Sequence, residues 1–378
     1  MKYYIFFDGI YNWPIKSGKH YLAQILSRYN QVTCFDRPNF VNLIHLTLQS
    51  INFREKISNR LHVIHSFSFI PKSQKYLTID KISYYLNYKI FRSKVRNNSD
   101  MTVISYTPEL YLIEKQFQNI NIFYYVVDDY LSYPLWSNKN SKKNFLLLEK
   151  KFIKVCEGII VSSITLFEKY NKLHPHVFYF PNPSPIKAFL KSYNQNNPIP
   201  SDIENLKKPI IGFIGGIENY RINLDLIKTT ADSFPEYSFV LIGPVNIVNK
   251  EKIKLPECTN IYYLGVKPHE ILINYLHCFD VAIIPYKLND YGNACFPMKI
   301  FEYLAIGKPV VTTALPAIKY LSRHNLIYWS ENNQKFIENI RVALNEINKK
   351  KIIEARIQEA NKNDWHSRIN QLINFIEN

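Results

Sequence analysis

The sequence predicts an α/β protein made of two doubly wound domains, each a mainly parallel sheet covered by helices. Strand-sized apolar runs alternate with helical patterns in two series. A polar stretch rich in Asn and Pro at 194–208 separates the two series and is typical of a linker. Runs such as GIIVSS at 158–163 are apolar on both sides of the strand, which is typical of a buried parallel sheet.

The first series occupies about 200 residues. Its strands are expected at 3–7, 32–35, 62–69, 101–106, 122–127, 158–162 and 177–180, where β-branched and aromatic residues cluster. A helix is expected at 17–29, because Ser17 is a suitable N-cap before the run GKHYLAQILSRY.

The second series repeats the pattern. Its strands are expected at 210–214, 238–242, 261–264, 281–285, 309–312 and 326–329, and its helices at 223–233, 269–277, 297–305 and 334–347. The chain ends in an amphipathic helix whose apolar stripe includes Trp365 and Ile369. Ligands of open parallel sheets bind at the carboxyl ends of strands, so the strand-to-helix turns are where chemistry is expected.

Composition excludes several classes of protein. A chain of 378 residues that is 47% hydrophobic and 15% aromatic can build cores, which excludes global disorder. No apolar run approaches the roughly 18–20 residues that span a bilayer, which argues against an integral membrane protein. The N-terminus lacks the features of a signal peptide, so we expect the cytoplasm. The five cysteines form no CxxC pair, which argues against a disulfide framework or a zinc site.

The positive charge is concentrated in the first half. The net charge is +16, with 26 Lys+Arg against 12 Asp+Glu in residues 1–200 and 21 against 19 in residues 201–378. Residues 51–100 hold 10 against 3, interleaved with aromatic residues. This pattern favours an anionic membrane surface or a lipid-phosphate substrate. A solvated basic face is the alternative. We expect no nucleic-acid partner, because the chain has no RNA-recognition or zinc-finger signature.

Two turns of the second series suit an anion. In IIGFIGGIENY at 210–220 a buried strand ends in Gly215 and Gly216, whose backbone N–H groups can approach a phosphate, although a tight turn without a ligand is equally consistent. Arg221 follows and either pairs with a phosphate or is exposed.

The second turn lies in the segment 280–313. Pro297 suits the first position of a helix, and Lys299 and Glu302 then lie on one face of its first turns. A lysine there is suited to an anion, and a glutamate one turn later can accept two hydrogen bonds from a vicinal diol such as a ribose.

The run PMKIFEYLAIGKPVV at 297–311 resembles the donor-binding signature of GT-B glycosyltransferases. The segments PIIGFIGGIENYRINLDLI, FPEYSFVLIGP and TNIYYLGVKPHEILINYLHCFDVAIIPY follow that family's order and spacing. The resemblance is strong over about 205–330 and is closest to bacterial enzymes of capsular, teichuronic or exopolysaccharide synthesis. It implies two Rossmann-like domains facing a cleft: an acceptor-binding, membrane-proximal domain at 1–200, a nucleotide-sugar domain at 205–362, and a helix at 363–378 that returns to the first domain.

The resemblance also implies roles for matching residues. Gly215 and Gly216 would hold the diphosphate, Lys299 would neutralise it, and Glu302 would bind the ribose. The loop at Gly265–Val266 would hold the base through backbone groups. The residues expected to line the sugar pocket are Phe296, Pro297 and Met298. Many retaining members carry a glutamate where this chain has Ala294, so the stereochemistry stays open.

The first domain offers a general base for the acceptor. The apolar strand before YYVVDDYLSYP ends in Asp128 and Asp129, whose side chains should diverge, so that one projects at the sheet edge. The resemblance favours Asp128, while the alternative is that Asp128 caps the next turn. Asp8 and His20 are further candidates, each with a structural role as its alternative.

These observations predict a metal-independent glycosyltransferase that needs no cofactor beyond its nucleotide-sugar donor, UDP-linked by class. Its acceptor would be a saccharide or a lipid-linked saccharide in bacterial surface polysaccharide synthesis, at the inner face of the cell membrane. The alternatives are an inactive GT-B scaffold in a polysaccharide assembly and a nucleotide-sugar epimerase on the same fold.

Overall fold

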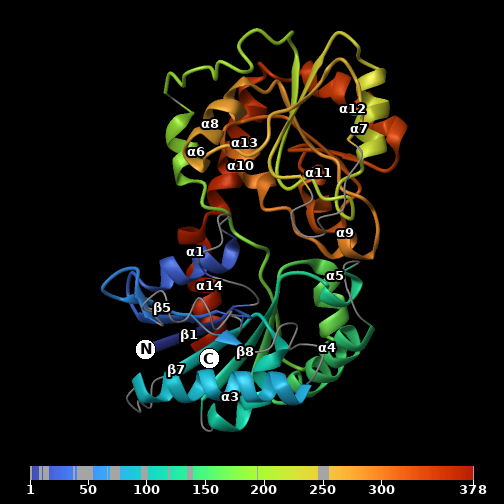
Figure 1. Ribbon diagram of the computed structural model, residues 1–378. Coiled ribbons are helices and arrows are strands. Elements are labelled where there is room, and N and C mark those ends of the chain that lie inside the picture. The colour runs from blue at the N-terminus through green and yellow to red at the C-terminus, as the bar shows by residue number, and fades with distance from the viewer. Residues whose placement is uncertain are drawn as a thin grey trace. The chain divides into compact units, whose positions relative to one another are not determined.

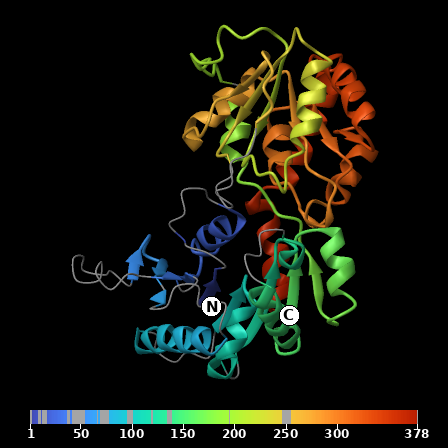
Figure 2. The same cartoon turned by 45° about the vertical axis from the view of Figure 1, so that its right-hand side comes forward.

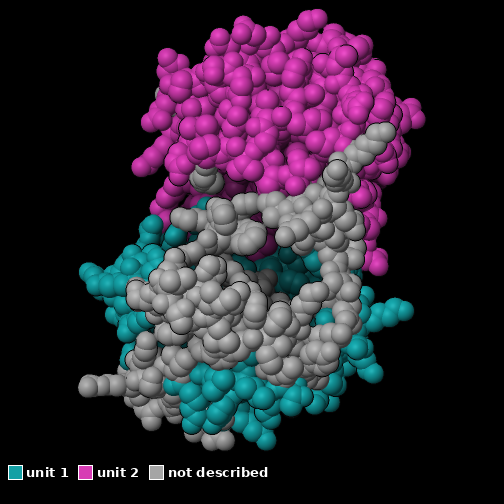
Figure 3. All heavy atoms as spheres, in the orientation of Figure 1, with its two compact units in different colours: residues 1–181, 369–378 teal, residues 182–368 magenta. Residues whose placement is uncertain are grey.

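The structure is a computed structural model in which the chain divides into two compact units. It describes residues 2–7, 11, 17–36, 39–40, 54–65, 67–68, 77–94, 101–117, 120–133, 139–193, 195–245 and 255–377. Unit 1 comprises residues 1–181 and 369–378, and unit 2 comprises residues 182–368 (Figure 3).

Unit 1 is built on a mainly parallel sheet with the order β10-β9-β8-β7-β1-β2-β5-β4 among its described residues. Its strands are β1 (Lys2–Phe6), β2 (Gln31–Phe35), β4 (Arg54–Lys56), β5 (Leu61–Ile64), β7 (Met101–Ser105), β8 (Asn121–Val126), β9 (Gly158–Val161) and β10 (Val177–Tyr179). β4 is antiparallel to β5. Its helices are α1 (Gly18–Leu26), α3 (Leu77–Lys94), η2 (Pro108–Phe117), η3 (Tyr130–Ser132), α4 (Lys139–Phe152) and α5 (Ile164–Tyr170). The 3₁₀ helix η2 contacts both α3 and α4 (Figure 1).

Unit 2 has a parallel sheet with the order β13-β12-β11-β14-β15-β16, which is the doubly wound order 3-2-1-4-5-6. Its strands are β11 (Ile210–Ile214), β12 (Ser238–Ile242), β13 (Ile261–Tyr263), β14 (Val281–Ile284), β15 (Val310–Thr313) and β16 (Tyr328–Ser330). Its helices are α6 (Lys187–Ser192), α7 (Leu224–Asp232), α8 (His269–Cys278), α9 (Asp290–Ala294), α10 (Lys299–Ala305), η4 (Pro316–Ile318), α11 (Lys319–Arg323), α12 (Asn333–Leu344) and α13 (Lys350–Lys362). α7 and α12 lie on one face of the sheet, and α8 and α10 on the other (Figures 1 and 2).

The predicted fold class is confirmed. The strands of both sheets are parallel except for β4, and every strand predicted in the second series is present within a residue or two of its predicted bounds. The central strands β11, β12 and β14 are buried along their whole length, as their continuous apolar sequences predict.

One strand prediction is wrong in its second half. The alternating run at 62–69 reads as one strand, but β5 ends at Ile64, and β6 (Phe67–Ser68) pairs with β3 (Asn39–Phe40) in a separate sheet. Strand β5 ends just before His65, whose ring contacts Asp36 and Glu55. That contact joins residues far apart in sequence, so the local pattern does not reveal it.

The boundary between the units also lies earlier than the predicted one. Residues 182–200 group with unit 2, because Ile186 and Phe189 are buried in the hydrophobic core of that unit. At the other end, α14 (Trp365–Glu377) contributes residues 369–377 to unit 1. There the ring of Phe375 stacks on Phe178 with 4.8 Å between the ring centroids.

Candidate functional site

Three glycines lie at the carboxyl ends of neighbouring strands in unit 2. Gly215 follows β11, Gly243 follows β12 and Gly265 lies beyond β13. The Gly215 N–H donates to the Ile242 carbonyl at 2.8 Å, and the Gly243 N–H donates to the Gly265 carbonyl, also at 2.8 Å. The ladder of hydrogen bonds thus continues past the strands and fixes this edge of the sheet.

Two of these positions leave no room for a side chain. Gly243 has φ +141°, and a Cβ there would meet the Gly215 carbonyl oxygen at 2.0 Å. A Cβ on Gly215 would meet Lys299 Cε and Phe213 Cζ, each at 2.8 Å. By contrast, a Cβ on Gly216 would make an ordinary contact of 3.8 Å with Glu218. The end of the Lys299 side chain therefore lies directly against Gly215.

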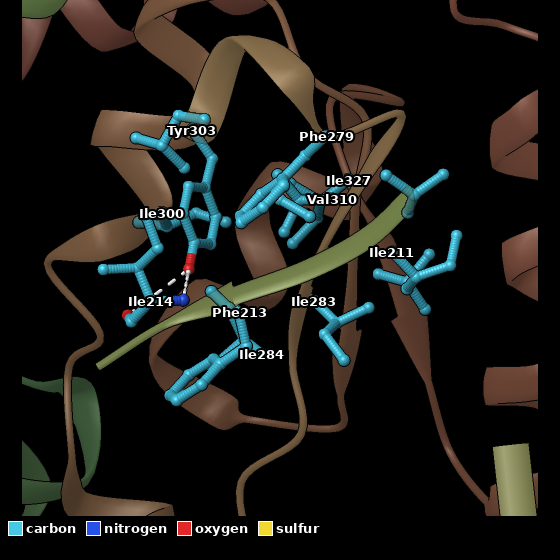
Figure 4. Close-up of a cluster of buried hydrophobic side chains, with 14 of the residues drawn as sticks. Ile211, Phe213, Ile214, Phe279, Ile283, Ile284, Ile300, Tyr303, Val310 and Ile327 are labelled. Atoms are coloured by element: carbon cyan, nitrogen blue, oxygen red, sulfur yellow. Dashed lines mark hydrogen bonds between the residues drawn. The ribbon is translucent and has the colours of Figure 1, made fainter. Parts of the chain in front are cut away.

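The start of this turn is held by Tyr303. Its buried hydroxyl accepts a hydrogen bond from the Ile214 N–H at 3.0 Å and donates to the Ile214 carbonyl at 3.5 Å (Figure 4). Ile214 is the last residue of β11, so a side chain of α10 fixes the point where the Gly215–Gly216 turn begins.

Lys299 carries a charge that no ion pair among the described residues of unit 2 neutralises. Burial lowers the pKa of Lys299 below its ordinary value, and the charge of Arg221 acts in the same direction while Glu302 opposes it. In the part of the chain that the structure describes, no carboxylate lies within ion-pair distance of Lys299 or Arg221. Two cations therefore meet at the glycine edge, and such a place attracts an anion.

The helix that carries Lys299 begins later than predicted. α10 begins at Lys299, so Pro297 is not its first residue. The Pro297 carbonyl instead accepts from the Ile300 N–H at 3.0 Å, a tight turn before the regular helix.

Glu302 is held by a buried serine. Ser184 Oγ donates to Glu302 Oε1 at 3.2 Å. Ser184 is fully buried, and its N–H donates to the Asn363 carbonyl at 3.1 Å. Among the described residues, the second carboxylate oxygen, Oε2, has no hydrogen-bond partner, and Glu302 is half-buried, so the carboxylate is held at one oxygen.

The loop after β13 is anchored from the linker. Lys267 Nζ forms an ion pair with Asp202 at 2.8 Å, and the Tyr275 hydroxyl donates to the same carboxylate at 2.8 Å. Gly265 has φ +66°, and the Val266 side chain is 67% exposed. The loop thus presents its backbone and an exposed valine next to the glycine edge.

The three predicted sugar-pocket residues differ in their surroundings. Phe296 is part of the hydrophobic core of unit 2, and its ring lies 5.8 Å from that of Phe301. Pro297 is buried and Met298 is half-buried. Ala294 is buried at the end of α9.

In unit 1, the two aspartates follow β8 and differ in their contacts. Asp129 pairs with Lys169 Nζ at 2.8 Å and accepts from Ser132 Oγ at 2.6 Å. Burial alone would raise the pKa of Asp129, but these two hydrogen bonds outweigh it and hold the pKa below its ordinary value. Asp128 is half-buried, and its carbonyl accepts from the Tyr130 N–H at 3.0 Å.

The two other candidate residues of unit 1 are Asp8 and His20. Asp8 lies outside the described residues. His20 is buried, with its Nε2 2.9 Å from the Tyr11 carbonyl and its Nδ1 accepting from the Ser17 N–H at 3.0 Å, so it has a structural role.

A cluster that sequence analysis did not single out lies at the ends of β2 and β5. His65 Nδ1 lies 2.7 Å from the buried Asp36 and Nε2 lies 3.2 Å from Glu55. With a carboxylate at each ring nitrogen, the imidazole is a bridge between strands.

Gly243 and Ser184 were also missed as site residues. The signal for Gly243 was present, because VLIG at 240–243 repeats the strand-then-glycine pattern of GFIG. Ser184 carries no local signal, since it lies 118 residues from Glu302.

The described residues contain no cluster of three or more His, Cys, Asp or Glu side chains placed to hold a metal ion. None of the helices they form is long and apolar enough to cross a membrane.

Unit 2 is similar to proteins of known family. Residues 208–346 match the family model for group 1 glycosyl transferases. TuaH of Bacillus subtilis (strain 168), a protein assigned as a glycosyltransferase of teichuronic acid biosynthesis, is 29% identical over 192 residues, which cover 49% of this chain and 47% of TuaH. The match thus spans about half the length of that relative.

Solved structures match over the whole chain. Sucrose-phosphate synthase of Thermosynechococcus elongatus has a TM-score of 0.73 at 12% identity and covers 99% of this chain and 98% of its own. HepE of Anabaena, solved in complex with UDP, has a TM-score of 0.68 at 13% identity and covers 100% of this chain and 99% of its own. At such identities the likeness shows the fold alone. The chain therefore has a GT-B fold of two Rossmann-like domains, and residues 208–346 of unit 2 resemble group 1 glycosyl transferases.

Proposed function

We propose that this protein transfers a glycosyl residue from a nucleotide sugar to a saccharide or lipid-linked saccharide during synthesis of a bacterial surface polysaccharide. The observation that carries the proposal is the pair of cations, Arg221 and Lys299, beside the glycine edge of unit 2. Neither has an ion pair among the described residues, and Lys299 lies against Gly215. A diphosphate supplies the anionic partner that these two side chains lack.

The other donor contacts are proposed at the same edge of the sheet. The N–H groups near Gly215 and Gly216 approach the diphosphate, and Glu302 accepts hydrogen bonds from the ribose hydroxyls. The backbone at Gly265–Val266 holds the base. Pro297 and Met298 line the sugar pocket, and Phe296 shapes it from the hydrophobic core. UDP is the first nucleotide to test, because the HepE structure holds UDP.

In an inverting transfer, Asp128 is the general base. It accepts the proton of the acceptor hydroxyl, whose oxygen bonds to the anomeric carbon while the bond from that carbon to the diphosphate breaks. Lys299 and Arg221 stabilise the charge on the leaving diphosphate without a metal ion. Asp129 is less suited to the task, because Lys169 and Ser132 already occupy its oxygens.

An anionic membrane surface is the proposed partner of unit 1, and α3 supports this. The helix buries Ser83, Tyr84, Asn87 and Tyr88 on one face and exposes Ile82 at 57% and Leu86 at 42% on the other. Exposed Lys81 and Lys89 belong to the same outward face, as does Tyr85, over whose ring Lys89 Nζ lies at 5.3 Å. Apolar side chains flanked by lysines suit the interface of an anionic leaflet at the inner side of the cell membrane. Of residues 51–100, the structure describes 54–65, 67–68 and 77–94.

The donor assignment is tested by thermal stabilisation with a panel of nucleoside diphosphates and their sugars. A ligand at 100 times its Kd should stabilise the chain by about 2.7 kcal/mol. A selective shift should disappear in Lys299→Ala, and transfer should be lost in Lys299→Ala and Glu302→Ala. Normal turnover in both variants contradicts the assignment. Donor turnover to an epimer or free sugar without an acceptor favours the epimerase alternative, and no donor binding favours the scaffold.

The base is tested with matched aspartate variants. Asp128→Asn should abolish transfer and leave UDP binding intact, whereas Asp129→Asn should retain transfer. The reverse result assigns the base to Asp129.

Membrane association is tested by co-sedimentation with vesicles of phosphatidylglycerol or of phosphatidylcholine. The wild-type chain should bind the anionic vesicles, and Ile82→Gln/Leu86→Gln should bind them weakly while keeping its affinity for UDP. Equal binding of the variant and the wild type places the contact elsewhere.

A further inference from the structure

The guanidinium of Arg221 is surrounded by tyrosines. Its Cζ lies 5.5 Å from the ring centroid of Tyr220, 6.0 Å from that of Tyr286 and 5.6 Å from that of Tyr291. Its Nη2 donates to the Tyr291 hydroxyl at 2.9 Å and to the Tyr220 hydroxyl at 3.3 Å. Three aromatic rings and two phenol oxygens therefore hold the cation.

The rings are themselves fixed. Tyr286 and Tyr291 are buried, and the rings of Tyr220 and Tyr291 meet edge to face with 5.3 Å between centroids. The loop after β14 is bonded to the turn that carries Arg221: the Lys287 N–H donates to the Arg221 carbonyl at 2.7 Å, and Asn289 Nδ2 donates to the Tyr220 carbonyl at 3.0 Å. The segments 219–223 and 285–291 therefore form one rigid corner at the carboxyl ends of two paired strands, β11 and β14.

These contacts stabilise the cation and leave its charge in place. A carboxylate would cancel the charge of Arg221, whereas a neutral phenol and a ring face stabilise the guanidinium without adding a negative charge. Tyrosine is neutral near pH 7, since its ordinary pKa is about 10. Arg221 Nε is buried and has no hydrogen-bond partner in the described chain. The guanidinium thus retains both charge and donor capacity.

We propose that Tyr220, Tyr286 and Tyr291 form a neutral cage that presents Arg221 to the diphosphate of the donor, with the Tyr291 hydroxyl setting the orientation of the guanidinium. The proposal rests on the proposed function and adds positioning residues to it. Tyr291 acts through Arg221, so it should affect the phosphates of the ligand and not the nucleoside.

The test compares UDP and uridine on the full chain, with Kd measured by calorimetry for UDP and by ligand-observed NMR for uridine. Tyr291→Phe keeps the ring and removes the hydroxyl. It should weaken UDP binding about tenfold, as expected if the reoriented guanidinium loses one hydrogen bond to the charged diphosphate, and leave uridine binding unchanged. Tyr237→Phe is the control, because that ring stacks on Phe234 before β12, away from the site in sequence and contacts.

A double-mutant cycle shows whether Tyr291 acts through Arg221. In the Arg221→Met background, adding Tyr291→Phe should not weaken UDP binding further. A full additional loss in that background, an equal loss of UDP and uridine, or unchanged UDP affinity in Tyr291→Phe would each overturn the cage. A wild-type chain that binds no nucleoside diphosphate overturns the proposed function as well, so the two failures are distinguishable.

Discussion

Gly215 sits where the fold and the donor site meet, so Gly215→Ala tests both. The new Cβ would lie 2.8 Å from Phe213 Cζ and 2.8 Å from Lys299 Cε, closer than real Cβ contacts come. Phe213 is buried in the core, whereas the end of the lysine is flexible. The lysine is therefore expected to move most, and its amine should leave the position proposed to face the diphosphate.

The magnitudes follow from these contacts. Overpacking of this kind costs typically about 1–3 kcal/mol, which corresponds to a fall in Tm of roughly 2–12 °C for a domain of this size. Loss of the hydrogen bond from Lys299 to a phosphate costs about 1.5–3 kcal/mol, or roughly ten- to a hundredfold in Kd for UDP.

The assay pairs a thermal melt with UDP calorimetry, and Gly216→Ala is the matched control for the melt. Its Cβ would meet Glu218 Cγ at 3.8 Å, an ordinary contact, so its stability should stay within about 0.5 kcal/mol of the wild type. A Gly215→Ala chain that melts and binds UDP like the wild type would contradict the close contact of Gly215 with Phe213 and Lys299.

Three further predictions concern single contacts. Ser184→Ala should raise KM for the donor severalfold with little change in kcat, since it frees Glu302, the residue proposed to bind the ribose; steady-state kinetics check this. Lys169→Met should move acid unfolding to higher pH, because the lowered pKa of Asp129 gives stability that is present above the unfolded pKa and lost as the pH falls through the folded one; melts from about pH 3 to 6 check this. The hydrogen bond to Asp36 is the main cause that raises the pKa of His65. The protonated imidazole therefore stabilises the fold below about pH 6.5, and this stabilisation is lost as the pH rises through the raised pKa. His65→Gln should therefore flatten the dependence of Tm on pH between about 5 and 8, and an unchanged profile would contradict this.

Much of unit 2 could be predicted from sequence because its signals are local. A buried strand such as β11 is apolar at every position, and the glycines that follow it mark the turn within a few residues. The motif around Lys299 and Glu302 lies on one helix, so its spacing alone places both side chains together.

The features that sequence missed join distant residues. Ser184 reaches Glu302 across 118 positions, and Arg221 meets Tyr291 across 70. In unit 1, α3 was not predicted, because its apolar and aromatic residues lie on both faces: it buries Tyr84 and Tyr88 beside Ser83 and Asn87, and it exposes Ile82, Tyr85 and Leu86. Such contacts follow from the tertiary fold and have no period in the sequence.

The most direct test of the proposed donor site is an experimental structure of the protein with UDP. We expect the diphosphate at the Gly215–Gly216 turn, with its oxygens within hydrogen-bond distance of Lys299 Nζ and the Arg221 guanidinium, and the ribose on Glu302. UDP bound with its phosphates away from both cations would contradict it.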